Sequence, residues 1–331
     1  MADGIALAVE GGGSHTSAAV YEGGARTRYV HGPTSNPRSI SASDAMDTLH
    51  RMLLDILTGL SGAISIYVGH GAASTAREAA QLGRRLDRLR ESASVGDIIV
   101  VNDLVPLALI EPTRNVVVAA AGTGTGFLAR SHDGLWRRAS GQEFVLSDEG
   151  GGYDIGLAAL RAAIREADGR GRPTILTDLL SEMRACTPAE LPHHLFETVY
   201  EDPTSIKVEV AQYARAVFAA AAALDPVARD ILSAAANEIC LGVTAVARAL
   251  KIDLSTSLLV LTGSLLTACD GLRENVLAGL QSGLARSEVL VASDDLVRNV
   301  RELGNHIDRL RTETIRHPWL PVYLSASHGE A

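Results

Sequence analysis

The chain has few cysteines, lysines and aromatic residues. Its 331 residues include 3 cysteines, and only 4% are Phe, Trp or Tyr. Cys186, Cys240 and Cys269 form no C-x-x-C pair, which argues against a disulfide framework or a zinc site. Lysine occurs only at Lys207 and Lys251, and the net charge is −9. Nucleic-acid-binding proteins neutralise phosphates with basic faces, so we do not expect nucleic acid as a partner.

Long apolar runs are also lacking. No segment approaches the roughly 20 consecutive apolar residues that a membrane span requires. The N-terminus has neither the basic flank nor the cleavage pattern of a signal peptide. We therefore expect a soluble, cytoplasmic protein with no membrane partner. Hydrophobic residues make up 47% of the chain, which is enough for two cores, so two domains are the starting expectation.

A strand, a glycine-rich turn and a second strand follow one another twice. The first copy turns through Glu10-Gly11-Gly12-Gly13-Ser14-His15-Thr16, and the second through Gly122-Thr123-Gly124-Thr125-Gly126. The backbone amides and hydroxyls of such turns can bind phosphate. Neither turn opens a helix, as a P-loop or a dinucleotide-binding fingerprint would. The repetition predicts two related halves.

A polar pair follows the buried strand predicted at Ile98–Val101. Asn102 and Asp103 lie where this strand passes into a helix. Ligands in open α/β sheets bind at such carboxyl ends of strands, so Asp103 is a candidate catalyst. The simpler alternative is that Asp103 is the N-cap of the helix that begins at Leu104. The two roles are compatible.

Six short motifs together resemble a known superfamily. They are VEGGGSHT at Val9–Thr16, GPTSNP at Gly32–Pro37, ND at Asn102-Asp103, GTGTG at Gly122–Gly126, DEGGGYDIG at Asp148–Gly156 and LTGS at Leu261–Ser264. The chain resembles the acetate kinase, hexokinase, Hsp70 and actin superfamily, and within it the N-acetylglucosamine kinase group of the BadF/BadG type. The resemblance implies an α/β fold of two ribonuclease-H-like (actin-like ATPase) domains with an interdomain cleft. We expect these at residues 1–113 and 114–331, with a helical insertion at about 153–250 and a last helix that is a candidate to pack on the N-terminal domain.

The resemblance also implies a reaction. It is the ATP- and Mg²⁺-dependent transfer of a phosphoryl group to a sugar hydroxyl, the 6-hydroxyl of N-acetylglucosamine or a related amino sugar, in a homodimer. Asp103 would be the general base, and Glu10 would hold Mg²⁺ through water. The phosphates of ATP would contact Gly11, Gly12, Gly13, Ser14, His15, Thr16, Gly122, Thr123, Gly124 and Thr125, and its adenosine Gly263 and Ser264. The sugar would contact Asn36, Asp103, Thr123, Gly124, Gln142, Glu143 and Asp148.

Several of these residues have a structural alternative. Gly11, Gly12 and Gly13 could serve only a tight turn, and Asn36 could serve only to begin an Asn-Pro turn. Asp148 and Glu149 could be a solvated acidic pair; we favour sugar binding for Asp148 and assign no role to Glu149.

The sequence departs from the family pattern in two places. Relatives carry G-G-W-G before the acidic loop, whereas this chain has Ser140-Gly141-Gln142-Glu143. A carboxylate thus replaces an aromatic wall, and glucosamine or an aminocyclitol, whose ammonium would pair with Glu143, becomes an alternative acceptor. Relatives also have a glycine- and alanine-rich segment near the C-terminus, where this sequence predicts one charged helix from Ser293 to Thr314. The expected adenine contacts are less secure for that reason.

Two alternatives come from other functional classes. The ATPase activator of 2-hydroxyacyl-CoA dehydratases shares the BadF/BadG name, but its iron–sulfur cluster needs thiolates close together, and the three cysteines provide no local pair. A non-enzymatic ATP-binding protein, built like the Hsp70 ATPase core, would have no use for the sugar-contacting residues Asn36 and Asp103.

Overall fold

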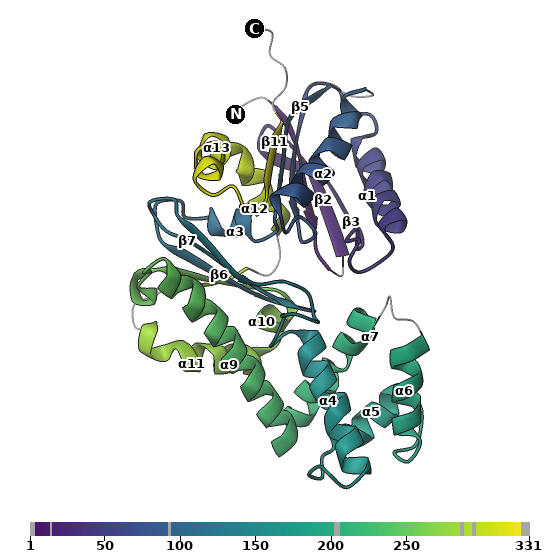
Figure 1. Cartoon of the computed structure of the whole chain (residues 1–331). Helices are drawn as coiled ribbons and strands as arrows, with labels where there is room; N and C mark the ends of the chain where they lie inside the picture. Colours follow the sequence, from purple (N-terminus) through teal and green to yellow (C-terminus); the bar gives the residue numbers. More distant parts are fainter. Residues whose placement is uncertain are drawn as a thin grey trace. The chain divides into compact units, whose positions relative to one another are not determined.

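The computed structural model describes residues 4–13, 15–91, 94–201, 206–284, 288–292 and 296–325. The chain divides into two compact units (Figure 1). Unit 1 comprises Met1–Val116, Ala129–Arg137 and Asp294–Ala331, and unit 2 comprises Val117–Leu128 and Arg138–Ser293. The chain therefore first leaves unit 1 close to the boundary expected at residue 113. Two later segments, which the sequence analysis assigned to the second domain, return to unit 1.

Unit 1 is built on a six-stranded sheet with the order β11-β5-β4-β1-β2-β3. The neighbours β1, β4 and β5 are parallel, whereas β2, β3 and β11 run antiparallel to the strands they pair with. The carboxyl ends of β1, β4 and β5 consequently meet at one edge of the sheet. The strands are β1 (Ile5–Gly11), β2 (His15–Glu22), β3 (Ala25–Pro33), β4 (Ile64–His70), β5 (Val95–Val101) and β11 (Val322–Ser325).

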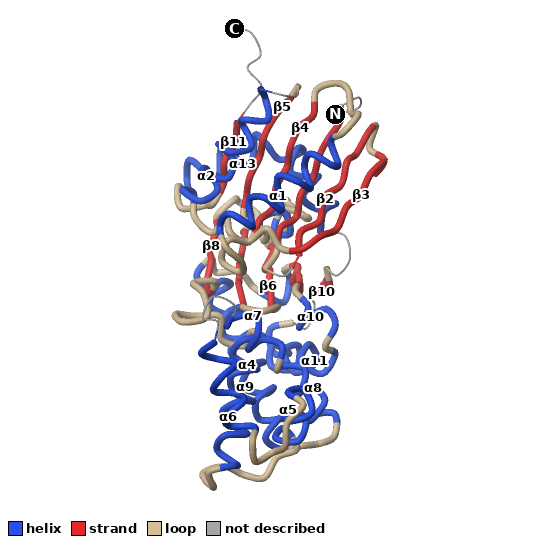
Figure 2. Tube along the Cα trace, turned by 90° about the vertical axis from the view of Figure 1, so that its right-hand side faces the viewer, coloured by secondary structure: helices blue, strands red, loops and turns tan. Residues whose placement is uncertain are grey.

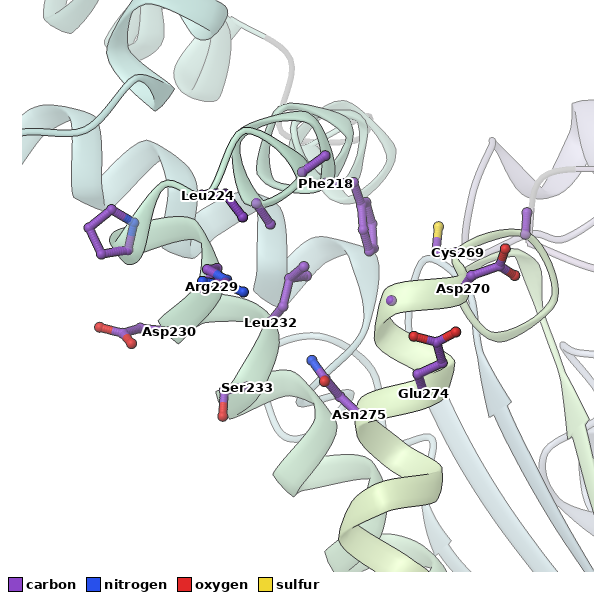
Figure 3. Close-up of a pocket in the computed structure, with 15 residues that line it drawn as sticks. Phe218, Leu224, Arg229, Asp230, Leu232, Ser233, Cys269, Asp270, Glu274 and Asn275 are labelled. Atoms are coloured by element: carbon purple, nitrogen blue, oxygen red, sulfur yellow. The ribbon is translucent and has the colours of Figure 1, made fainter.

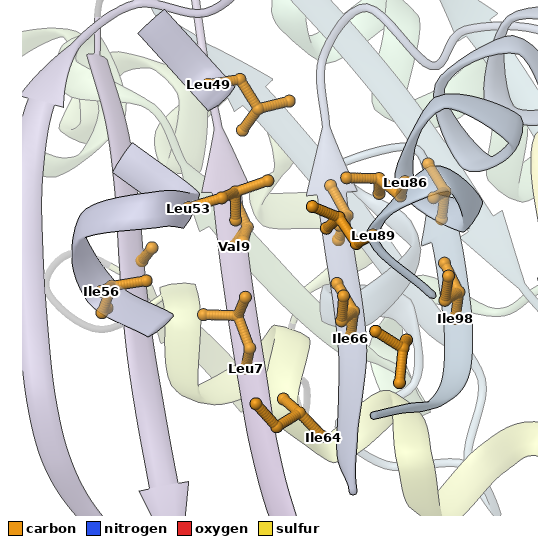
Figure 4. Close-up of a cluster of buried hydrophobic side chains, with 14 of the residues drawn as sticks. Leu7, Val9, Leu49, Leu53, Ile56, Ile64, Ile66, Leu86, Leu89 and Ile98 are labelled. Carbon is orange, nitrogen blue, oxygen red and sulfur yellow. The ribbon is translucent and has the colours of Figure 1, made fainter. Parts of the chain in front are cut away.

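Helices cover both faces of this sheet. On one face, α1 (Ala42–Leu57) and α2 (Ala76–Asp87) pack on the strands and form a buried cluster with them, shown in Figure 4. On the other face lies α12 (Leu296–Arg301). A Cβ atom on Gly69 of β4 would lie 2.9 Å from Val300 of α12, so the helix approaches the strand very closely. The remaining helices of unit 1 are α3 (Val105–Ala108) and α13 (Ile307–Arg316).

The C-terminal part of unit 1 differs from the prediction. The single charged helix expected to reach Thr314 is interrupted by a 3-10 segment, Glu302–His306, between α12 and α13. The chain then continues into β11, which the sequence did not predict and which pairs antiparallel with β5. This strand is only four residues long, and its pairing with a distant strand leaves no local pattern in the sequence.

Unit 2 contains most of a five-stranded sheet with the order β10-β9-β6-β7-β8, together with a set of helices that Figure 2 shows in blue. The strands are β6 (Val116–Ala121), β7 (Thr125–Arg130), β8 (Trp136–Ser140), β9 (Leu258–Thr262) and β10 (Glu288–Val291). The helices are α4 (Gly152–Ala167), α5 (Leu176–Arg184), α6 (Leu191–Glu201), α7 (Ile206–Gln212), α8 (Ala214–Ala222), α9 (Pro226–Ala249), α10 (Ser264–Ala268) and α11 (Asp270–Leu280).

Helix α9 is long and apolar enough to cross a membrane by length and composition alone. It packs against α4, α8 and α11 within unit 2, and Leu232, Ile239 and Val243 are among its buried residues. The ring of Phe127 lies so close to Gly242 that no side chain would fit at that position. One such helix is weak evidence for a membrane span, and these contacts are those of a core helix.

Candidate functional site

Polar residues gather at the edge of the first sheet where three parallel strands end. Glu10 and Gly11 of β1 pair with Gly69 and His70 of β4. Asp103 follows β5, whose last residue pairs with Gly69. These are the carboxyl ends at which ligands bind in open α/β sheets.

Asp103 and Asn36 approach the same glycine. A Cβ atom on Gly71 would lie 3.3 Å from Asp103 Oδ2 and 3.5 Å from Asn36 Nδ2. The backbone amide of Gly71 donates to Gly11 O at 2.8 Å, which ties this glycine to the end of β1. The expected base and an expected sugar-binding amide therefore lie side by side in unit 1.

Asp103 is not the N-cap of the following helix. The N-cap of α3 is Leu104, which makes no side-chain capping bond, and the amide of Leu104 donates to Asn102 Oδ1 at 3.2 Å. Asn102 therefore binds the helix start, and the alternative role of Asp103 as a cap is wrong.

The two residues that precede Asn36 are held by hydrogen bonds to Gly12 and His70. The hydroxyl of Thr34 donates to Gly12 O at 2.9 Å, and Ser35 Oγ lies 3.0 Å from His70 Nε2. The side-chain oxygen of Asn36 accepts a bond from the amide of Arg38 at 3.0 Å, so Asn36 does make the turn considered as its alternative role. The side-chain nitrogen is the part directed at Gly71.

His70 holds this segment in a buried polar network. Only 2% of the residue is exposed, and burial lowers its pKa to about 4. The amide of Ala72 donates to Nδ1 at 3.0 Å, so in the neutral ring Nε2 carries the proton and donates to Ser35 Oγ. Ser35 Oγ also lies 2.8 Å from Thr16 Oγ1. This neutral network positions the residue that precedes Asn36.

Glu10 is a buried carboxyl beside Asp103. It is 6% exposed, and its pKa is raised to about 8, mainly by burial and further by the charge of Asp103. His15 Nε2 lies 3.6 Å from Glu10 Oε2. A cation near two such carboxylates would relieve their repulsion, and oxygen ligands suit Mg²⁺.

The described residues include no group of three or more His, Cys, Asp or Glu that could hold a metal ion. An all-protein metal centre is thus not formed among them. Glu10 alone fits the arrangement in which Mg²⁺ is held by one or two carboxylates, water and substrate phosphates.

The first glycine turn is tighter than the sequence predicts, since β1 extends to Gly11 and β2 begins at His15. A Cβ atom on Gly11 would lie 2.2 Å from the His70 ring, so this glycine serves packing. The amide of Gly12 donates to His15 O at 2.9 Å, and Thr16 is fully buried with its hydroxyl bonded to Ser35. These contacts favour the structural alternative for Gly11 and Gly12, and they engage the Thr16 hydroxyl within the protein.

Gly13 and His15 retain exposed surface in this turn. Ser14 lies outside the described residues.

The second glycine turn, residues 122–124 in unit 2, is attached to the start of α4. Gly152 N donates to Gly122 O at 2.8 Å, and Tyr153 N donates to Thr123 O at 2.9 Å. The hydroxyl of Thr125 is used internally, because it lies 2.9 Å from Ser140 Oγ and donates to Glu149 O. Within the described part of the chain the Thr123 hydroxyl makes no hydrogen bond, so Thr123 is the better candidate of the two threonines for a ligand contact.

Gly263 and Ser264 lie next to this turn. Gly263 has φ +84°, and a Cβ atom there would lie 2.4 Å from Ala121 O, so both conformation and space require glycine. Ser264 Oγ lies 3.9 Å from the position of a Cβ atom on Gly122. The two expected adenosine contacts are therefore adjacent to the expected phosphate turn.

The acidic loop that precedes α4 contains an ion cluster that the sequence analysis did not predict. Lys207 Nζ of α7 lies 2.6 Å from Glu143 Oε2 and 3.2 Å from Asp148 Oδ2. Asp148 is 4% exposed, so the alternative of a solvated acidic pair is wrong for this residue, whereas Glu149 is exposed. Gln142 is also exposed, and its amide donates to Ser147 Oγ at 2.7 Å. In the sequence, Lys207 stood out only because lysine occurs at just two positions.

An open groove of about 850 Å³ lies in unit 2 between the α8–α9 connection and the start of α11 (Figure 3). Phe218, Leu224 and Leu232 provide apolar walls, and Ser233 and Asn275 provide polar groups. The lining on the α11 side begins at Ala268, four residues after Ser264. One side of the groove is thus formed by residues that follow the expected adenosine contacts in the chain, and the other side is formed by residues of α8, α9 and their connection.

Comparison with known proteins gives one family and a consistent set of relatives. The model of the BadF/BadG/BcrA/BcrD ATPase family matches residues 7–292. The N-acetylmuramic acid/N-acetylglucosamine kinase of Clostridium acetobutylicum is 28% identical over 268 residues, which cover 78% of this chain and 85% of that protein. The N-acetyl-D-glucosamine kinase of Dictyostelium discoideum is 26% identical over 270 residues, which cover 76% of this chain and 82% of that protein.

Solved structures share the fold. A protein from Chromobacterium violaceum assigned as an N-acetylglucosamine kinase aligns with a TM-score of 0.70 at 19% identity, covering 92% of this chain and 99% of that one. A glucokinase of the ROK family from Streptomyces griseus, solved with glucose and AMPPNP, aligns with a TM-score of 0.53 at 15% identity, covering 91% and 99%. The α/β architecture with two sheets is thus the architecture of sugar-kinase structures.

Proposed function

Since the chain belongs to the BadF/BadG/BcrA/BcrD ATPase family, we propose that it is an ATP-dependent sugar kinase that phosphorylates the 6-hydroxyl of an N-acetylated amino sugar. The observation that carries the proposal is the approach of Asp103 and Asn36 to the same backbone position, Gly71, at the carboxyl ends of parallel strands. Two curated relatives that act on N-acetylglucosamine support the choice of substrate.

In the proposed reaction, Asp103 accepts the proton of the sugar hydroxyl as that oxygen attacks the γ-phosphorus of ATP. Asn36 donates its side-chain amide to a neighbouring oxygen of the sugar and so fixes the ring. The buried Ser35–His70 hydrogen bond keeps Asn36 in place during the reaction. Little covalent chemistry is required of the protein, because phosphoryl transfer depends mainly on alignment and on compensation of charge.

Glu10 is the residue that would hold Mg²⁺ through water, and the ion when bound would compensate phosphate charge. In unit 1, the exposed Gly13 and His15 are our candidates for phosphate contacts. In unit 2, the candidates are the amides of the Gly122–Gly124 turn and the Thr123 hydroxyl.

We assign the adenosine of ATP to Gly263 and Ser264 and to the groove whose α11 side follows them in the chain. A purine base is flat and apolar on its faces, which suits Phe218 and Leu232, and polar at its edge, which suits Ser233 and Asn275. Ala221→Trp would fill the groove and should raise the KM for ATP about 10-fold or more, since it removes a pocket contact worth more than about 1.4 kcal/mol. Ala223→Trp is the matched control, because Ala223 is exposed and is not part of the groove lining.

The decisive experiment is an ADP-release assay with ATP and Mg²⁺ over N-acetylglucosamine, N-acetylmuramic acid, N-acetylmannosamine, glucosamine and glucose. We expect the N-acetylated sugars to give the highest kcat/KM. Release of ADP at the same rate with and without every sugar would reject a sugar kinase and favour an ATPase of the activator or switch type.

Glucosamine is the weaker acceptor candidate. The sequence suggested that its ammonium would pair with Glu143, but Glu143 already pairs with Lys207 at 2.6 Å. A substrate ammonium would have to displace that lysine or lie beside it. We therefore expect glucosamine to be a poorer substrate than N-acetylglucosamine.

A further inference from the structure

We propose that Lys207 is the positioning residue that holds Asp148 as an ionised hydrogen-bond acceptor for the sugar. This inference rests on the proposed function, in which Asp148 contacts the acceptor. Lys207 comes from α7, 59 residues further along the chain, and bridges Asp148 and Glu143 with its ammonium group.

The position of Asp148 leaves its carboxylate little freedom. A Cβ atom on Gly124 would lie 2.2 Å from Asp148 Oδ2, so the carboxylate lies directly against the backbone of the second glycine turn. Asp148 and Glu143 both have left-handed backbone conformations, with φ of +70° and +71°. Non-glycine residues adopt this conformation at a cost, so surrounding contacts must hold the loop in place.

Lys207 provides the charged contacts that hold this loop. Its ammonium is within hydrogen-bond distance of both carboxylates, and its side chain is 15% exposed, so water screens the interaction only in part. Lys207 Nζ also lies 5.9 Å from the centre of the Phe144 ring. The ring of Phe144 in turn packs against Tyr153 at the start of α4.

Burial and Lys207 act on Asp148 in opposite directions. Burial, the largest effect, raises the pKa of Asp148, Lys207 lowers it, and the charge of Glu143 raises it. The loop also carries Glu149, α4 carries Tyr153, Asp154, Arg161, Arg165 and Glu166, α7 carries Glu209, and Glu238 of α9 lies beside Gly150. The charges that act most strongly on Asp148 are those of Lys207 and Glu143.

Without Lys207, Asp148 and Glu143 would face each other with no cation between them. Asp148 would then stay protonated to higher pH and would offer a hydroxyl in place of a carboxylate oxygen. A carboxylate accepts a sugar hydroxyl more strongly than a neutral acid does. Loss of Lys207 should therefore weaken sugar binding and change the pH dependence of that binding.

The test compares wild type with Lys207→Met, Lys207→Arg, the double variant Lys207→Met/Glu143→Gln, and the control Lys251→Met at the exposed second lysine. In Lys207→Met we expect the KM for N-acetylglucosamine to rise roughly 10-fold at pH 7 with kcat changed much less. The acidic limb of kcat/KM should move to higher pH by about 1 unit or more. Lys207→Arg should recover most of the loss and the double variant part of it, because the double variant removes the repelling charge.

A second readout does not depend on turnover. Carboxyl ¹³C NMR, with Asp148 assigned through Asp148→Asn, should show Asp148 titrating at higher pH in Lys207→Met than in wild type. If wild type is an active sugar kinase and Lys207→Met changes neither this titration nor the KM, the role of Lys207 is wrong and the proposed function stands. If wild type phosphorylates no sugar, the proposed function and the role of Lys207 toward the acceptor both fail.

Discussion

Asp103 Oδ2 and Asn36 Nδ2 both lie within 3.5 Å of the position that a Cβ atom on Gly71 would occupy. One residue follows β5 and the other follows β3, so only the folded sheet of unit 1 brings them together. A carboxylate beside a side-chain amide can accept a proton from one oxygen of a polyhydroxylated substrate while the amide binds another. This pairing makes the role of Asp103 testable.

Asp103→Asn should abolish most phosphoryl transfer and leave the fold and ATP binding intact. The amide has the same shape but accepts no proton, so we expect kcat to fall by about 100-fold or more. Sugar-dependent ADP release measures kcat, and isothermal titration with an ATP analogue measures nucleotide binding. A variant that turns over at close to the wild-type rate would show that Asp103 is not the base.

Gly11→Ala should destabilise unit 1, because the new methyl group would meet the His70 ring at 2.2 Å. Overpacking of this kind costs typically 1–3 kcal/mol. Gly13→Ala is the matched control in the same turn, since the nearest atom to its Cβ would be Ser39 Oγ at 3.8 Å. Urea unfolding of the two variants distinguishes the cases. Equal stabilities would mean that His70 moves aside without cost.

The strands and the position of Asp103 were predictable because they depend on local patterns. Apolar runs bounded by glycine identify β1 and β6, and a polar pair directly after a buried run identifies a strand end. The predicted alternation of strands and helices corresponds to the observed α/β architecture with two sheets.

Other features depend on residues far apart in the sequence and could not be predicted. Gly11 was assigned to phosphate binding because the neighbouring sequence gives no indication that the His70 ring occupies the space beside it. Lys207 meets Asp148 only because α7 packs on α4. The four residues of β11 form a strand through their antiparallel pairing with β5. In each case the partner lies at least 59 residues away, and a local pattern in the sequence carries no information on so distant a contact.

Glu10 should make stability fall as pH rises. Its pKa is about 8 in the folded protein against 4.5 as its ordinary value, so between these values the folded state holds a proton that the unfolded state has lost. The free energy of unfolding therefore decreases as pH rises from about 4.5 to 8. Glu10→Gln should remove this decrease and should be more stable than wild type at pH 8, by up to a few kcal/mol.

Urea unfolding of wild type and Glu10→Gln at pH 5, 6.5 and 8 checks this prediction. The two proteins should differ least at pH 5 and most at pH 8. Glu22→Gln is a suitable control, because Glu22 is an exposed glutamate at the end of β2. A constant difference between wild type and Glu10→Gln at all three pH values would mean that Glu10 is not protonated in the folded protein near neutrality.

The last prediction concerns the ion pair that holds the C-terminal helix in unit 1. Arg130 is fully buried, and its guanidinium binds both carboxylate oxygens of Glu313 on α13, at 2.5 and 3.2 Å. Trp136 Nε1 also donates to Glu313 at 2.7 Å, and Arg130 donates to Pro112 O at 2.9 Å. Arg130 on β7 and Trp136 on β8 thus bind the carboxylate of a residue that lies 177 or more positions further along the chain.

Glu313→Gln would leave the buried guanidinium without its carboxylate, which costs typically 3–5 kcal/mol. Glu302→Gln, which breaks the partly exposed pair with Arg301, should cost only about 0–1 kcal/mol. The double variant Arg130→Met/Glu313→Leu replaces the pair with apolar side chains and should recover part of the loss, because no buried charge remains although Trp136 Nε1 and Pro112 O lose these partners. Urea unfolding gives all three values, and equal costs for the Glu313 and Glu302 variants would mean that water reaches Arg130 and compensates its charge.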